Sequence, residues 1–153
     1  DIATNSDTIR VYNIHLASNW FRQSDYSFIK NPTLEKKKLK RNILSIGKRL
    51  KKSFAKRAEQ VEAIKKHINK SPYPVIVCGD FNDTPNSYAY QQLAHGLKDA
   101  FIEKGIGLGG TYKGTFPYLR IDYILSSNEL NIKSFNTKDI KLSDHYPVLA
   151  GFN

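Results

Sequence analysis

Residues 74–82 have the sequence Pro-Val-Ile-Val-Cys-Gly-Asp-Phe-Asn, a continuous apolar run that ends in polar residues. An apolar run without alternation, flanked by proline and glycine, is typical of a central strand that is covered on both faces. The polar residues after it predict a loop, and residues 87–93 predict a short helix. Asp80 and Asn82 should therefore lie where a buried strand ends.

Strands and one long helix are predicted around this run. Residues 9–16 alternate in strand periodicity, and residues 121–125, 132–135 and 146–152 are rich in strand-forming side chains. Residues 34–69 carry apolar side chains at every third or fourth position and predict one amphipathic helix. Residues 17–34 and 94–119 are expected to be mainly irregular. The pattern predicts an α/β fold.

Length and composition predict a single globular domain over residues 1–153. No apolar run approaches the roughly 20 residues of a membrane span. The lone cysteine, Cys78, is expected to be a buried thiol, and it excludes an intrachain disulfide. These features leave the cellular compartment open.

The chain has a formal charge of +10, and most of the excess lies in one segment. Between Lys30 and Lys70 there are 15 of the 24 lysines and arginines, against three glutamates. Two interpretations are open: a solvated helix surface, or a surface that binds an anion such as nucleic acid or an anionic membrane.

Four polar clusters share one position, at the end of a predicted strand or beside it: Asn13 with His15, Asp80 with Asn82, Asp122, and Asp144 with His145. Strand ends that meet at one sheet edge can bring such groups around one ligand. Carboxylates buried together without partners are costly, and a divalent cation of the Mg²⁺ type would offset that cost. A histidine beside a carboxylate is favoured as imidazolium, which suits stabilisation of a charged transition state.

These clusters resemble, in order and wording, the motifs of the endonuclease/exonuclease/phosphatase superfamily, which includes DNase I, apurinic/apyrimidinic endonucleases, sphingomyelinases and inositol polyphosphate phosphatases. The motifs are Asn13-Ile-His15-Leu, Gly79-Asp-Phe-Asn82, Arg120-Ile-Asp-Tyr-Ile-Leu125 and Ser143-Asp-His-Tyr-Pro-Val148. The resemblance implies the C-terminal half of a DNase I-like four-layered α/β sandwich. Residues 1–153 would be one partial domain, a mixed sheet with helices on one face, including one long basic helix.

The resemblance also implies roles for individual residues. Catalytic roles fall on His15, Asp80, Asn82, Asp122 and His145, and Mg²⁺ or Mn²⁺ ligation on Asp144 and Asp80. Asp80 would orient or deprotonate the attacking water, and Asn82 would hold this water and a phosphate oxygen. Asp122 would pair with His145, which would stabilise charge at phosphorus. His15 would lie near the scissile phosphate.

The chain departs from the superfamily pattern because the Asn and Glu motifs of the first half do not precede Asn13. The principal Glu ligand of the metal is thus expected in a missing N-terminal half, which would be a partner of this chain. Alone, the chain is expected to bind metal weakly and to have little activity. An apolar sheet face left uncovered is expected to favour self-association.

The leading hypothesis is a metal-dependent phosphoesterase, a phosphodiesterase or nuclease, that hydrolyses a phosphate ester by in-line attack of an activated water. Its substrate would be a nucleic acid, a phospholipid or another phosphate ester. The alternative is a non-catalytic module that keeps the superfamily fold and binds an anionic partner or nucleic acid through its basic face.

Overall fold

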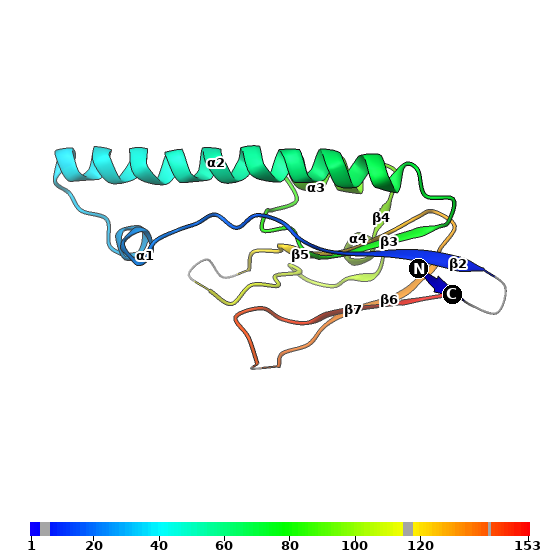
Figure 1. The fold of residues 1–153 in the computed structure, drawn as a ribbon. Coiled ribbons are helices and arrows are strands. Elements are labelled where there is room, and N and C mark those ends of the chain that lie inside the picture. The colour runs from blue at the N-terminus through cyan, green and yellow to red at the C-terminus, as the bar shows by residue number, and fades with distance from the viewer. Residues whose placement is uncertain (4–6, 115–117, 141) are drawn as a thin grey trace.

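The computed structural model of the protein describes residues 1–3, 7–114, 118–140 and 142–153. Its elements are, in chain order, β1 (Ile2–Ala3), β2 (Thr8–His15), α1 (Gln23–Lys30), α2 (Lys36–Ile68), β3 (Val75–Asp80), α3 (Tyr88–Ala94), β4 (Lys98–Asp99), α4 (Ala100–Lys104), β5 (Asp122–Ser126), β6 (Ile132–Thr137) and β7 (Val148–Phe152). Figure 1 shows the long helix α2 above the strands. Of the helices in these ranges, none is both long and apolar enough to cross a membrane.

The main sheet has five strands in the order β1-β2-β3-β5-β4, so the strand of the apolar run, β3, is central as predicted. β3 is parallel to β2 and antiparallel to β5, which makes the sheet mixed. The register pairs His15 with Asp80 and Asp80 with Asp122. The polar ends of three neighbouring strands therefore meet at one edge of the sheet.

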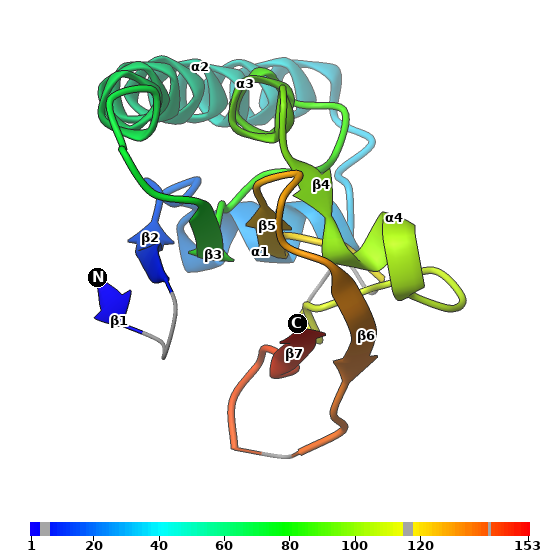
Figure 2. The same cartoon turned by 90° about the vertical axis from the view of Figure 1, so that its right-hand side faces the viewer.

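Figure 2 shows α2 and α3 on one side of the main sheet and the β6–β7 hairpin on the other. Two hydrophobic clusters hold these layers together. On one face, α2 and α3 pack through residues such as Val61 and Leu93 against Val77 of β3. On the other face, α4 and the β6–β7 hairpin pack around Ile124 and Phe135. The mixed α/β sheet with a long basic helix on one face is confirmed, and the five-residue α4 is the helix that lies on the other side.

The β6–β7 hairpin covers only part of the apolar sheet face that was expected to be uncovered. Ile76 and Cys78 of β3 pack against the hairpin cluster. Their neighbours in register on β2, Val11 and Asn13, are half-buried and exposed, respectively. Self-association through this remaining strip of the sheet face stays a prediction.

Gly79 lets β2 approach β3 closely beside the candidate site. Its φ is +134°, and a Cβ at this position would lie 1.9 Å from the carbonyl oxygen of Ile14. Any other residue would combine a strained backbone with a steric clash at the centre of the sheet. The glycine thus permits the strand pairing that places His15 beside Asp80.

Two segments expected to be irregular contain helices, because contacts distant in sequence stabilise them. In α1, the Asp25 carboxylate accepts the Arg22 backbone N–H at 2.8 Å and pairs with Arg49 of α2 at 3.1 Å. In α4, Asp99 caps the first turn and pairs with Arg120 at 2.5 Å. Neither partner is visible in the local periodicity on which the sequence prediction depends.

Candidate active site

Two aspartates and one histidine form the centre of the candidate site. Asp80 ends β3, Asp122 begins β5, and the loop before β7 brings in His145. One ligand atom from each of these three side chains lies within 4.8 Å of the other two. The structure therefore brings together three of the predicted site residues from segments far apart in the sequence.

Asp122 fixes the orientation of His145. The Nδ1 atom of His145 lies 2.8 Å from Oδ2 of Asp122, while the backbone N–H of Asp122 donates to the Thr111 hydroxyl at 3.1 Å. The Tyr112 ring contacts the imidazole edge-on, with centroids 5.2 Å apart. Because Nδ1 faces the carboxylate, Nε2 is the ring nitrogen available to a ligand.

Asp80 is held by Asn82, the next polar residue along the chain. Its two carboxylate oxygens accept the backbone N–H of Asn82 at 2.7 Å and the side-chain amide at 3.0 Å. The same amide donates to the carbonyl oxygen of Leu16 at 3.0 Å, which ties the loop to the end of β2. His15 lies nearby, with Nε2 3.6 Å from Asp80 and its side chain largely exposed.

These groups face a hollow of about 400 Å³. His15, Asp80, Asn82 and His145 line it, and Trp20, Phe21 and Tyr26 form an aromatic wall from the segment around α1. Asp144 also lines this hollow. It does not belong to the group of three residues with closely spaced ligand atoms, which consists of Asp80, Asp122 and His145. Metal ligation by Asp144 therefore stays a prediction.

The acidic groups of the site fit a hard divalent cation. Burial raises the pKa of the Asp80 carboxyl, and the neighbouring Asp122 raises it further. The Asn82 N–H and the two histidines lower this pKa, but they do not cancel the effect of burial. Two carboxylates side by side in a half-buried site are stabilised by a cation that accepts oxygen ligands, as Mg²⁺ and Mn²⁺ do.

The raised pKa of Asp80 predicts a pH-dependent effect of Asp80→Asn on stability. An Asp whose pKa is higher in the folded than in the unfolded protein destabilises the fold when ionised, and this penalty disappears as pH falls below the ordinary Asp pKa of about 3.9. Without divalent cations, we expect the melting temperature of Asp80→Asn, relative to the unaltered chain, to increase as pH rises from mildly acidic to neutral. If this relative melting temperature, measured in EDTA, stays constant or decreases over the same pH range, the pKa of Asp80 is not raised in the folded protein.

Arg57 supports the hollow from α2 and was not singled out by the sequence. Its guanidinium is buried, pairs with Asp83 at 2.9 Å, and donates to the Ala17 carbonyl at 2.6 Å and to Asn19 at 3.0 Å. In the sequence, Arg57 resembles the solvated lysines around it. The one signal that could have distinguished Arg57 is its place four residues before Val61, on the apolar stripe of the helix.

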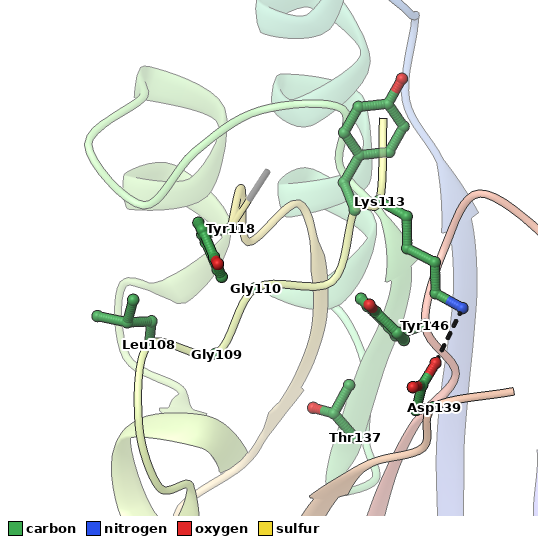
Figure 3. A pocket seen from close by; sticks show the side chains of 9 residues that line it. Leu108, Gly109, Gly110, Lys113, Tyr118, Thr137, Asp139 and Tyr146 are labelled. Carbon is green, nitrogen blue, oxygen red and sulfur yellow. Dashed lines mark ion pairs between the residues drawn. The ribbon is translucent and has the colours of Figure 1, made fainter. Parts of the chain in front are cut away.

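A second hollow of about 560 Å³ adjoins the first, and Tyr112 lines both (Figure 3). Lys113 lies over the Tyr146 ring, 4.0 Å from its centroid, and pairs with Asp139 at 3.3 Å. Tyr118 lies across this hollow from Tyr146. The glycine-rich part of residues 94–119, expected to be mainly irregular, also supplies Thr111 and Tyr112 to the candidate site.

Comparisons with solved structures give the same fold. A functionally unknown conserved protein from Enterococcus faecalis V583 is 22% identical with a TM-score of 0.59, over 66% of this chain and 45% of that one. The mannosyl-6-phosphatase Bt3783 from Bacteroides thetaiotaomicron is 23% identical with a TM-score of 0.50, over 67% and 46%. Truncated TDP2 from Caenorhabditis elegans is 17% identical with a TM-score of 0.53, over 97% and 55%.

The chain spans about half the length of these three solved structures. No curated protein sequence matches it. The profile of the Endonuclease/Exonuclease/phosphatase family matches residues 52–145, which is more than half of the chain and includes the Asp80, Asp122 and His145 positions. The chain therefore belongs to the endonuclease/exonuclease/phosphatase family.

Proposed function

We propose that the chain carries the acid-base half of a metal-dependent phosphoesterase site. The observation that supports this most strongly is the grouping of Asp80, Asp122 and His145 within 4.8 Å beside a hollow of about 400 Å³. A solvated turn or a helix cap needs no such convergence of charged groups. Family membership supports the same chemical class, because endonucleases, exonucleases and phosphatases all cleave phosphate esters.

In this proposal, the groups at the hollow act together in the chemical step. Asp80 accepts the proton of the attacking water. The Asn82 amide, whose N–H groups donate to Asp80 and Leu16, accepts a hydrogen bond from this water through its oxygen. The Asp122–His145 pair, joined at 2.8 Å, directs Nε2 of His145 toward the hollow, where its N–H donates to a phosphate oxygen as negative charge develops. His15, next to Asp80, contacts the scissile phosphate from the β2 side.

Asp80, with Asp122 or Asp144, would hold Mg²⁺ or Mn²⁺. When bound, such a cation neutralises the phosphate oxygens and activates water. These few carboxylates alone hold Mg²⁺ weakly, because the ion keeps most of its water shell and prefers a full set of oxygen ligands. We therefore infer that a further acidic ligand comes from outside this chain, as the family resemblance implies.

Hydrolysis of bis(p-nitrophenyl) phosphate tests the proposal. We expect the natural protein that contains this chain to hydrolyse this substrate in the presence of Mg²⁺ or Mn²⁺. Addition of EDTA should stop the hydrolysis. The chain alone should retain about 1% of that rate or less, since an incomplete set of ligands forfeits metal-ion stabilisation worth several kcal/mol. Metal-independent turnover would contradict the proposal. Salt-sensitive DNA binding by a natural protein without any turnover would favour the non-catalytic binding module instead.

A further inference from the structure

The N-terminal half of α2 has a face that nothing in the described chain covers. Figure 1 shows this half extending beyond the main sheet, with α1 beneath it. Further along α2, α3 lies against the same side of the helix: Glu62 accepts the hydroxyl of Tyr88, and the Lys65 ammonium donates to the His95 carbonyl at 2.5 Å. Figure 1 shows α3 along the C-terminal half of α2, away from the first turns of the long helix.

The uncovered face mixes large apolar side chains with lysines. At 3.6 residues per turn, it carries Lys36, Lys40, Ile43, Leu44, Gly47 and Lys51. Ile43 and Leu44 are each 55% exposed. A shallow apolar groove lies between Lys36, Leu39, Lys40, Ile43 and Leu44. Such a face is typical of helices that lie in a membrane interface, with the apolar side chains inserted and the lysine stems reaching back to the headgroups.

The charge of this region selects the class of partner. Between Glu35 and Glu59, every charged side chain is a lysine or an arginine. A second copy of the chain would bring two such cationic faces together, at a formal charge of +10 each, so self-association through this face is disfavoured. The phosphates of a nucleic acid would pair with the lysines, but these contacts would leave the apolar side chains of Ile43 and Leu44 exposed to water.

We propose that the N-terminal half of α2 is a docking surface for an anionic phospholipid bilayer. The apolar side chains Ile43 and Leu44 enter the interface, and the lysines beside them bind the lipid phosphates. The interaction is peripheral, since α2 is too charged to span the bilayer. It does not depend on the proposed hydrolysis, because none of these side chains lines the hollow beside Asp80.

Co-sedimentation of the chain with lipid vesicles tests the surface. We expect binding to phosphatidylcholine vesicles that contain one third phosphatidylglycerol, weakening with added salt, and little binding to phosphatidylcholine alone. The variant K36Q/K40Q/K51Q should lower the partition coefficient about 100-fold, because each lysine contributes about fivefold near an anionic surface. The variant I43S/L44S should lower it about 10-fold or more.

Matched variants elsewhere on the surface control for charge and apolarity. K66Q/K70Q/K104Q removes three exposed lysines, and I102S removes an exposed isoleucine of α4; neither should change the partition coefficient more than about twofold. Binding to a short DNA duplex should be insensitive to I43S/L44S. Vesicle binding that survives I43S/L44S unchanged, or that is equally reduced by the control triple variant, would overturn the proposal. Failure of the unaltered chain to bind anionic vesicles would do the same.

Discussion

Substitution of Asp80 by Asn in the natural protein is expected to reduce hydrolysis of bis(p-nitrophenyl) phosphate about 1,000-fold, within the range for removal of a general base. Asn has the shape of Asp but can neither accept a proton from water nor carry a charge for a cation. It can still accept the Asn82 backbone N–H, so the loop geometry should persist. The measurement is kcat/KM at saturating Mn²⁺, with a thermal melt to verify folding.

Asp139→Asn is the matched control for this loss. Asp139 is also a carboxylate near a hollow, but its side chain is 73% exposed and it pairs with Lys113 rather than with the site. We expect a change in kcat/KM of no more than about twofold, as for a surface charge remote from the chemistry. If Asp80→Asn behaves like Asp139→Asn in a folded protein, Asp80 is not the base.

The prediction of the fold from sequence succeeded where one element carries its own pattern. The apolar run of β3, the alternation of β2 and the stripe of α2 each identify an element without reference to the rest of the chain. Helix α1 has no such pattern, because it depends on Asp25 reaching Arg49 on α2. Long-range pairs of this kind are not visible in local periodicity.

The second large effect is expected from Arg57→Ala. The Arg57 side chain is 1% exposed and is the ion-pair partner of Asp83, whose side chain is 14% exposed. Truncation leaves a poorly solvated carboxylate without its cation and frees the Ala17 carbonyl and Asn19 side chain that Arg57 holds. Breaking a buried pair in this way costs about 3–5 kcal/mol of unfolding free energy. Urea denaturation followed by circular dichroism measures it.

Two further variants separate the ion pair from general effects on the helix. Lys56→Ala removes the neighbouring cation, which is exposed and lies 3.5 Å from Glu59, and should change stability by less than about 0.5 kcal/mol. The double variant R57M/D83N removes both charges and should recover part of the loss seen in Arg57→Ala. A double variant less stable than Arg57→Ala would show that the unpaired carboxylate is not the cause.

The candidate site was predictable to the extent that it lies at strand ends. Asp80, Asp122 and His15 follow from the ends of β3, β5 and β2, and the register brings them into adjacent positions. The supporting residues were not predictable, since Thr111 and Tyr112 come from a glycine-rich segment without periodicity. Their positions depend on the bridge between Tyr112 and His145, which only the folded chain forms.

Titration of the chain with Mn²⁺, followed by NMR of the histidine rings, tests the central claim most directly. Mn²⁺ broadens signals of nuclei close to it, even when it binds weakly, and the four histidines report on different places. We predict that the signals of His145 and His15 broaden well before those of His67, whose Nδ1 lies 2.7 Å from the Tyr12 hydroxyl, and His95, the residue that follows α3. In Asp80→Asn this order should disappear. Simultaneous broadening of all four rings in the unaltered chain, or an order that Asp80→Asn leaves intact, would contradict a cation site at Asp80, close to His145 and His15.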